Sequence, residues 1–433
     1  MLRSTFVWCL VVAAVPIALL RPFIGLLIYL VFAHGHIADF VWSDWAVHDW
    51  GMLIAGATLV GYLLFEMRRS PLRFHGLILL LAFWLWLAFT CLFAYDGSLA
   101  LSKLIQYSRI FVVTILIASM ANSESRVRTI LATIGVSLGL LGSKGALDFF
   151  LTGGRFRMMG PGGMLADENE YALGLDLAIP ILFYLASTEH RRWVAWCYRM
   201  MMVACGIVVI GTRSRSGFLG LCLAVLLLVI YSRRKTVGFV VLGLTCLTFF
   251  VIAPQAAVQR YQGIPDANER DASAEMRLAV WHVAAVMIRA NPVVGVGLRN
   301  FETAFPRYSN LESRAPHNAY LALAAEAGIP ACLLFLLMIG AAIRSMAVKR
   351  RRLRKAAPEN WRLANYCLAI QISLTVYLVP NFFINRQDQD LMYHLIGVAA
   401  GLGWVAMHRL LQLPEEETAA TGGEEMVLEP TGV

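Results

Sequence analysis

Charge is scarce in this chain of 433 residues. Only 15% of the residues are Asp, Glu, Lys or Arg, whereas 59% are hydrophobic. A soluble domain of this size carries about 25% charged residues, so the composition excludes an ordinary water-soluble globular protein. Apolar runs long enough to cross a bilayer, roughly 17–25 residues, recur from end to end. The sequence therefore predicts a polytopic helical membrane protein.

Several features that would indicate other classes of protein are also absent. No P-loop and no CxxC pair occurs, and the eight cysteines all lie in or beside apolar segments. We therefore expect no disulfides and no zinc site. No internal repeat is visible, which disfavours a transporter built from two related halves. The net charge of +9 does not indicate nucleic acid as a partner, because the basic residues concentrate in short loops.

Those basic loops predict the topology. The positive-inside rule places Lys/Arg-rich loops in the cytoplasm, and the loops concerned are 66–75, 123–128, 189–192, 232–235 and 344–362. The alternate loops then lie outside, at about 34–46, 94–103, 150–170, 212–216, 254–317 and 381–390. This alternation predicts about twelve transmembrane helices, with both termini in the cytoplasm.

The predicted fold is therefore an all-α transmembrane bundle with a long periplasmic loop that contains short helices. We expect helices one to nine within 1–253, a periplasmic loop with an amphipathic helix at 254–317, helices ten to twelve within 318–411, and a disordered cytoplasmic tail at 412–433. The first apolar span, 5–33, is too long for one straight helix. Pro16, Arg21 and Pro22 predict either a kink or a split into two half-crossings.

Arginine without lysine marks three of the outer loops. Segments 150–170, 212–216 and 254–317 contain no lysine but many arginines. A guanidinium binds phosphate through two parallel hydrogen bonds and keeps its charge when it is partly desolvated. Arg213 and Arg215, in the turn TRSRSG, either anchor lipid headgroups or clamp a lipid-linked diphosphate, and the sequence leaves both open.

The segment 277–331 is the most informative part of the chain. A helix is predicted to begin at Asp271 or Ser273 and to end at Ala290, because Asn291-Pro292 cannot continue it. A tight turn, VGVG, follows at 294–297. His317 and Asn318 then open the next span, which Gly328-Ile329-Pro330 interrupts. A histidine at the outer start of a membrane helix serves either as a general base or as a structural hydrogen bonder.

Two further polar clusters have two interpretations each. His34, His36 and His48 surround the first outer loop, where they could ligate a metal, but the Trp and Phe side chains around them favour an interfacial aromatic belt. Asp167, Glu168 and Glu170 precede another span. They could hold Mg²⁺, but capping that helix and pairing with arginines is the favoured interpretation.

Taken together, these motifs resemble a known family. The O-antigen ligase/polymerase superfamily has a signature similar to RLAVW (277–281), NPVVGVG (291–297) and HNAYLALAAEAGIP (317–330). Its T-x-S-R-G turn is similar to GTRSRSG (211–217), and its Asn-bearing helix start to DENEYALGLDLAIP (167–180). The segment RPFIGLLIYLVF (21–32) resembles O-glycosylation ligases associated with exosortase systems. Ala331 departs from the glycine found in many relatives.

The resemblance implies a glycosyltransferase of the bacterial inner membrane whose active site faces the periplasm. Such an enzyme takes a glycan from undecaprenyl diphosphate and joins it to a sugar hydroxyl of lipid A–core, with inversion and without a metal, a nucleotide sugar or another cofactor. The expected partners are this donor, this acceptor and membrane lipids. The motifs do not separate a ligase from a polymerase or a protein O-oligosaccharyltransferase, and a lipid or glycan transporter is the alternative from another class.

The resemblance also implies roles for individual residues. His317 is the expected general base, and Arg215 the expected group that neutralises the leaving diphosphate. Asn318 is expected to orient reacting groups. The expected substrate-binding residues are Arg213, Arg289, Arg277 and Asn169, together with Arg155 and Arg157 as candidates for phosphates of the acceptor.

Overall fold

The computed structural model describes residues 2–37, 50–73, 76–154, 156–232, 235–236, 238–240, 242–247 and 268–422, and all regular elements in these ranges are helical. Within the described residues, seven helices are long and apolar enough to cross a membrane: α5 (Gly97–Met120), α6 (Glu124–Leu151), α7 (Glu168–Thr188), α8 (Arg192–Gly211), α13 (Ala319–Ala356), α14 (Trp361–Leu378) and α15 (Asp390–Gly422). Shorter apolar helices accompany them: α1 (Leu2–Leu20), α2 (Pro22–Gly35), α3 (Trp50–Gly61), α4 (Ile78–Thr90) and α9 (Arg215–Tyr231). The chain is an all-α, multi-pass membrane protein, as the sequence predicted.

The predicted first span is an antiparallel pair of helices. The chain turns at Arg21, whose backbone leaves the helical region at φ −132° and ψ 74°. On either side of this turn Gly25 approaches Ala18 so closely that a Cβ on Gly25 would lie 2.6 Å from the Ala18 Cβ. Farther along, Val11 packs against Phe32. Both helices belong to the shorter apolar set, and together they form an antiparallel hairpin instead of a single kinked span.

This hairpin changes the predicted position of the N-terminus. Because α1 and α2 run in opposite directions, the start of α1 lies at the same end of the bundle as His34. His34 contacts His394 near the start of α15, whose other end leads to the C-terminus. The start of α1 and the end of α15 therefore lie at opposite ends of the bundle, which does not agree with the prediction that both termini lie on one side. The reason is Pro22, which cannot donate the hydrogen bond that would continue α1 but suits the first turn of a new helix.

Helix α7 runs through the centre of the bundle and packs against α6, α8, α9 and α14. Its side chains are buried almost along the whole length, including Pro180 in its middle. The helix begins at a strong cap, because the Asp167 carboxylate accepts hydrogen bonds from the backbone amides of Asn169 and Glu170. The polar start of α7 therefore belongs to a helix that is buried along almost its whole length.

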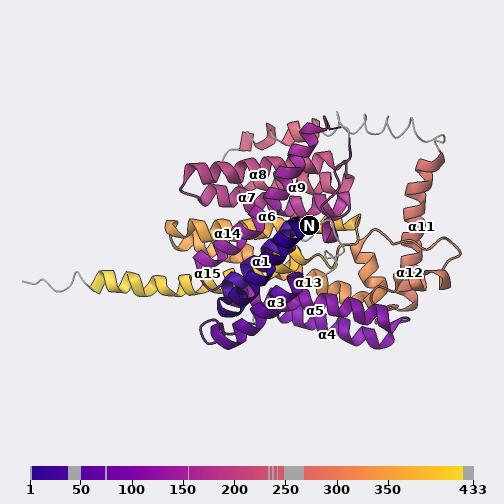
Figure 1. Cartoon of the computed structure of the whole chain (residues 1–433), viewed down its shortest axis with the longest axis horizontal. Helices are drawn as coiled ribbons and strands as arrows, with labels where there is room; N and C mark the ends of the chain where they lie inside the picture. The colour runs from indigo at the N-terminus through magenta and orange to yellow at the C-terminus, as the bar shows by residue number, and fades with distance from the viewer. Residues whose placement is uncertain are drawn as a thin grey trace, which may run out of the picture.

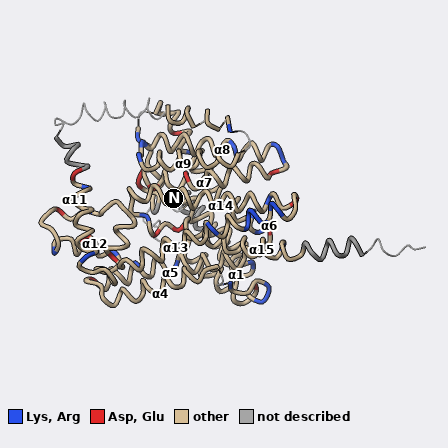
Figure 2. Tube along the Cα trace, turned by 180° about the vertical axis from the view of Figure 1, so that it is seen from behind, with Lys and Arg blue, Asp and Glu red and all other residues tan. Residues whose placement is uncertain are grey.

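The predicted loops gather in two groups at opposite ends of the bundle. Figure 1 shows α11 (Asn268–Ala290) and α12 (Phe301–Ala304) at one end, whereas α15 extends from the other. We call the first the α11 end. Ion pairs join three of the predicted cytoplasmic loops at the other end, namely Glu66 with Arg126 and Arg128 with Glu189. Charged residues lie mainly toward helix ends, with long uncharged stretches between them (Figure 2).

The interruption predicted in α13 is present. Gly328 has φ 82° and ψ 168°, so the helix breaks there, just before Pro330. The break leaves backbone carbonyls free, and the turn at 294–297 uses them. Val296 and Gly297 donate backbone hydrogen bonds of 2.9 and 2.8 Å to Ala325 and Glu326. The turn at 294–297 and the break at Gly328 are therefore joined by backbone hydrogen bonds, a contact that we call the joint.

Two helix boundaries differ from the prediction. Helix α11 ends at Ala290 as expected but begins at Asn268, ahead of both predicted caps. Helix α15 continues to Gly422, so the expectation of a disordered tail from 412 does not hold over 412–422. Extending a helix that already exists needs no new nucleation, and Glu, Leu and Ala are good helix formers.

Candidate functional site

The backbone at His317 is held in an unusual conformation from both sides. His317 has φ 45°, in the left-handed region that non-glycine residues rarely adopt. On one side, the Trp281 indole donates a hydrogen bond of 2.7 Å to the carbonyl of Pro316. On the other, the Asn318 amide donates one of 2.7 Å to Oδ1 of Asn385. Hydrogen bonds to Trp281 on one side and Asn385 on the other therefore fix the backbone around this histidine.

Asn318 is the N-cap of α13. Its Oδ1 accepts hydrogen bonds of 3.0 Å from the backbone amides of Tyr320 and Leu321. Its side chain is buried, at 4% exposure. Through this oxygen, Asn318 can orient reacting groups only indirectly. The oxygen caps the start of α13, and His317 is the residue just before that cap.

The imidazole of His317 is accessible to solvent but lies within a charged neighbourhood. The surrounding protein removes part of its water, and the positive charge of Arg277 acts in the same direction. Together they lower the pKa of His317 from its ordinary value of 6.5, against the opposite effect of Asp167 and Glu302. The imidazole is consequently neutral at pH 7, the form that can accept a proton.

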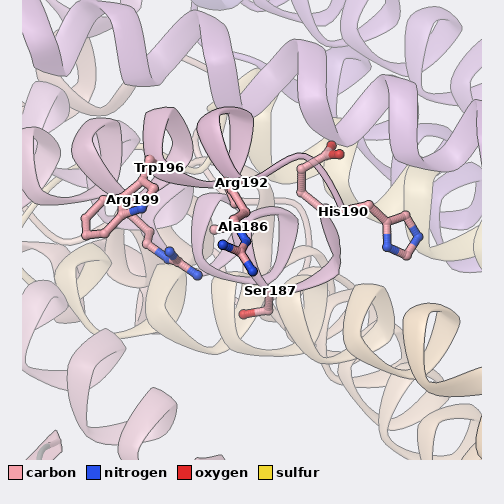
Figure 3. A pocket seen from close by; sticks show the side chains of 8 residues that line it. Ala186, Ser187, His190, Arg192, Trp196 and Arg199 are labelled. Carbon is pink, nitrogen blue, oxygen red and sulfur yellow. The ribbon is translucent and has the colours of Figure 1, made fainter.

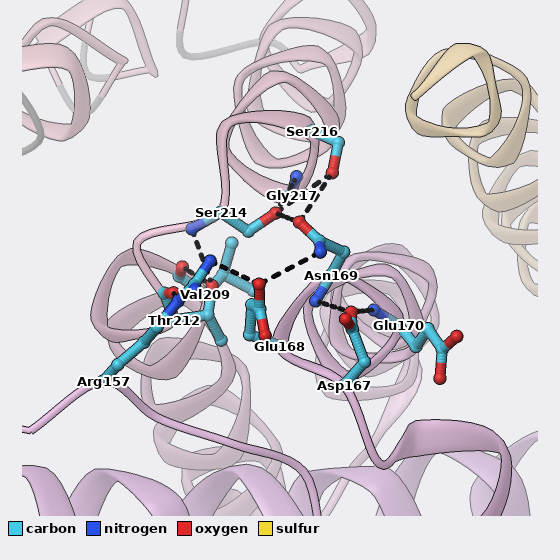
Figure 4. Close-up of polar contacts among 10 residues, drawn as sticks. All are labelled: Arg157, Asp167, Glu168, Asn169, Glu170, Val209, Thr212, Ser214, Ser216 and Gly217. Atoms are coloured by element: carbon cyan, nitrogen blue, oxygen red, sulfur yellow. Dashed lines mark hydrogen bonds and ion pairs between the residues drawn. The ribbon is translucent and has the colours of Figure 1, made fainter. Parts of the chain in front are cut away.

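A hydrogen-bonded cluster joins the start of α7 to the turn before α9 (Figure 4). Asn169 Oδ1 accepts hydrogen bonds from Ser214 Oγ at 2.7 Å and from Ser216 Oγ at 3.3 Å. Ser214 also caps α9 by accepting from the amide of Gly217 at 3.0 Å. A Cβ on Gly217 would lie 2.3 Å from the Cβ of Ala172, so this glycine lets α9 lie directly on α7.

Arg215 begins α9 immediately after this cap and is exposed. None of the described residues forms an ion pair or hydrogen bond with its guanidinium. Its location at a helix N-terminus is also favourable for an anion, because the helix dipole is positive there. Arg215 is therefore available to a ligand.

The other arginines of the predicted set are engaged or distant. Arg157 forms an ion pair with Glu168 and donates to the carbonyl of Thr212 at 3.1 Å. Arg213, at φ 54°, donates to the carbonyl of Gly154 at 3.0 Å. These contacts support the cap-and-pair interpretation of the acidic cluster. Arg155 lies outside the described residues.

Arg277 and Arg289 lie on different turns of α11. They lie twelve positions apart on α11, which corresponds to roughly 18 Å along a helix. Arg277 influences the pKa of His317, and both arginines are exposed. The structure therefore associates Arg277 with the histidine and separates Arg289 from it.

The segment 385–390 carries residues that the predicted site did not include. Arg386 forms an ion pair with Glu170 at the start of α7. Asp388 is buried, at 3% exposure, and pairs with Lys103 of α5 at 2.6 Å. Burial alone would raise the pKa of Asp388, but Lys103 and Arg386 hold it below its usual value. Nothing in the local sequence indicated this pairing, since Lys103 and Asp388 are 285 positions apart.

These contacts connect the site into one network at the α11 end. His317 is followed by Asn318, which bonds to Asn385, and Arg386 next to it pairs with Glu170. The backbone amide of Asn169 donates to Asp167, and the Asn169 side chain accepts from Ser214, the residue before Arg215. Three sequence motifs and the segment 385–390 therefore meet around the start of α7.

A cavity of about 340 Å³ lies at the other end of the bundle. It is lined by residues around the loop between α7 and α8, among them Ser187, Arg192, Trp196 and Arg199 (Figure 3). Glu189, which also lines it, pairs with Arg128 of the cytoplasmic-loop group. This cavity is separate from the network around His317.

Comparison with known proteins identifies one matching family model. Residues 175–336 match a model described as O-antigen ligase. The matched region includes Arg213, Arg215, Arg277, Arg289 and the pair His317-Asn318, whereas Asn169 and the segment 385–390 fall outside it. No curated protein matches the chain.

Proposed function

We propose that this chain is an O-antigen ligase, because its residues 175–336 match a family model described as O-antigen ligase. It would transfer a glycan from undecaprenyl diphosphate to a sugar hydroxyl of lipid A–core. The α11 end of the bundle would face the periplasm, and the protein would reside in the bacterial inner membrane. The superfamily consists of membrane-bound ligases and polymerases that act as glycosyltransferases; the donor, the acceptor and the orientation are our proposal.

One observation carries this proposal. A neutral, solvent-accessible imidazole and an arginine without a partner among the described residues belong to the same network at the α11 end. Transfer from a glycosyl diphosphate needs a base for the attacking hydroxyl and a cation for the leaving group. His317 and Arg215 supply these two groups.

The proposed reaction is a single displacement. The acceptor oxygen attacks the anomeric carbon from the face opposite the diphosphate, and His317 takes the hydroxyl proton. The bond between the anomeric carbon and the diphosphate oxygen breaks, so that undecaprenyl diphosphate leaves with the bonding electrons. Inversion follows from attack on the opposite face. Arg215 stabilises the negative charge that develops on the leaving group.

The remaining residues would position these two. Asn318 and Asn385 hold the backbone of His317, and Asn169 holds the cap that precedes Arg215. Arg277 would keep the imidazole neutral and stay close to the donor. No step in this scheme uses a metal ion, so withholding Mg²⁺ from the assay should leave the transfer rate unchanged.

Transfer between purified substrates tests the proposal. The full-length protein is incubated with an undecaprenyl-diphosphate glycan and offered lipid A–core and a pilin-like protein as competing acceptors, without an ion gradient. We expect glycan on lipid A–core. Joined glycan repeats on the donor would indicate a polymerase, glycan on the protein would indicate a protein O-oligosaccharyltransferase, and no transfer would contradict the proposal.

A further inference from the structure

A second polar cluster lies between α2 and α15. His34 is in the last turn of α2, and Asp390 and His394 lie four positions apart on α15, so both face the same side of that helix. One ligand atom from each of these three residues lies within 4.8 Å of the others. Helices from opposite ends of the sequence therefore bring two imidazoles and a carboxylate together.

Both histidines are withdrawn from water. His34 is 3% exposed and His394 is fully buried. Nε2 of His34 and Nδ1 of His394 lie 3.0 Å apart and share one hydrogen bond. The second nitrogen of His394, Nε2, has no hydrogen-bond partner among the described residues. Nδ1 of His394 therefore faces His34, and in a metal-bound form with Nδ1 as the ligand atom Nε2 would carry the ring proton.

The separation of these nitrogens is close to that of a metal site. Two imidazole nitrogens bound to one tetrahedral Zn²⁺ at about 2.0–2.1 Å lie roughly 3.3 Å apart. The histidines would need to separate by only a few tenths of an ångström. Neutral imidazole with one carboxylate suits zinc and its neighbours in the first transition series, whereas Mg²⁺ and Ca²⁺ prefer ligand sets of oxygen alone.

We propose that His34, Asp390 and His394 bind one divalent transition-metal ion of the zinc type, with water in the fourth position. Besides this small separation, binding needs a change of imidazole tautomer, which is possible because a neutral histidine can carry its proton on either nitrogen. Cysteine spacing could not indicate this site, since no cysteine takes part. The sequence interpretation favoured an aromatic belt around His34 because of the neighbouring Trp and Phe side chains, and it did not connect His34 with His394, which is 360 positions away.

The ion would clamp the α1–α2 hairpin to the start of α15. Asp390 is two positions after Asp388, which belongs to the network around His317. The ion would thus help to fix the segment 385–390 without touching the substrates. Its role is structural, and it does not depend on the proposed glycan transfer.

Zinc binding by the purified full-length protein tests this inference. The protein is stripped with a chelator and titrated with Zn²⁺, and metal content and thermal unfolding are measured. We expect one zinc per chain and a raised unfolding temperature. Asp390→Asn and His394→Ala should lose both effects. His408→Ala is the matched control, because His408 lies on the same helix but stacks on Trp404, and it should bind zinc like the wild type.

Asp390→Asn keeps the result decisive if His394→Ala does not fold, since an amide oxygen can still accept the hydrogen bond from Leu391. X-ray absorption of the zinc-bound protein should show only nitrogen and oxygen neighbours. The inference is overturned if the wild type binds no zinc, or if Asp390→Asn retains stoichiometric zinc and its stabilisation.

Discussion

At the scale of the residue, two non-glycine residues of the predicted site have a left-handed backbone conformation. His317 and Arg213 have φ 45° and 54°, and such conformations cost about 1–3 kcal/mol unless neighbours compensate. At His317 the compensation comes from Trp281, Asn318 and Asn385. Arg277 lies close enough to His317 to lower the pKa of its imidazole.

Replacing His317 should remove transfer activity and keep the fold. His317→Asn is preferable to alanine, because Asn tolerates a left-handed backbone. We expect the transfer rate to fall at least about 100-fold, the lower end of what a general base contributes. The rate is measured with a lipid-linked donor and lipid A–core, and unfolding temperature checks the fold. His282→Asn, an exposed histidine of α11, is the control. A fully active His317→Asn would remove this residue from the mechanism.

The pH profile should depend on Arg277. A general base works only when it is neutral, so the rate rises with pH through its pKa. Since burial and Arg277 both lower the pKa of His317, the midpoint of the acid limb should lie below 6.5. Arg277→Gln removes one of the two causes and should move this midpoint to higher pH, whatever it does to the maximal rate. An unchanged midpoint would show that His317 does not titrate in the rate.

Arg215 should not be replaceable by lysine. A guanidinium binds two diphosphate oxygens at once, whereas an ammonium is a point charge. Arg215→Lys should therefore reduce kcat/KM nearly as much as Arg215→Ala. Arg314→Lys, at an exposed arginine paired with Glu312, should leave it unchanged. Near-normal activity of Arg215→Lys would mean that charge attraction alone suffices.

At the scale of the element, the broken helix α13 supports the site. Its free carbonyls bind the turn at 294–297, and Ile329 donates a backbone hydrogen bond of 2.8 Å to Pro292. The indole of Trp86 reaches the carbonyl of Ala327 at 3.0 Å. A continuous helix would use these carbonyls itself, so the interruption is what joins α13 to the end of α11 and to α4.

Gly328→Ala should therefore destabilise the protein. A Cβ at Gly328 would lie 1.8 Å from the carbonyl oxygen of Val293, and the backbone has φ 82°. Left-handed strain alone costs about 1–3 kcal/mol, and the overlap adds to it. Gly340→Ala is the matched control, because it lies on the same helix with open space around it. Thermal unfolding in detergent compares them, and equal stability of the two variants would contradict this account of the joint.

At the scale of the whole molecule, a buried ion pair ties the last helix to α5. Lys103 and Asp388 meet at 2.6 Å, and Gln106 also donates to this carboxylate at 3.3 Å. Because the pKa of Asp388 is lowered in the folded protein, the ionised form stabilises the fold. This contribution is complete above the unfolded pKa of about 3.9 and is lost as the pH falls through the lower folded value.

Asp388→Asn should destabilise the folded protein by about 1–3 kcal/mol, since it leaves the half-buried Lys103 without a partner charge. The double variant Lys103→Met with Asp388→Leu should recover much of this loss, because no charge then remains to be paired. Chemical unfolding in detergent at pH 7 measures both. If the double variant were as unstable as the single one, packing rather than charge would explain the effect.

The sequence by itself determined the all-α membrane class and the break in α13, and its motifs indicated the resemblance to O-antigen ligases. These follow from local properties: apolar run length, basic loops, and glycine and proline at particular positions. It also indicated His317 and Arg215, because their motifs are continuous in the chain.

The tertiary structure alone decided which distant residues meet. The pairing of Lys103 with Asp388, of Glu170 with Arg386 and of His34 with His394 depends on how helices pack across the bundle. The hairpin of α1 and α2 likewise required knowing that Gly25 packs on Ala18. Contacts of this kind arise from complementary shape and charge between two surfaces. A short stretch of sequence does not indicate which other segment will supply the second surface.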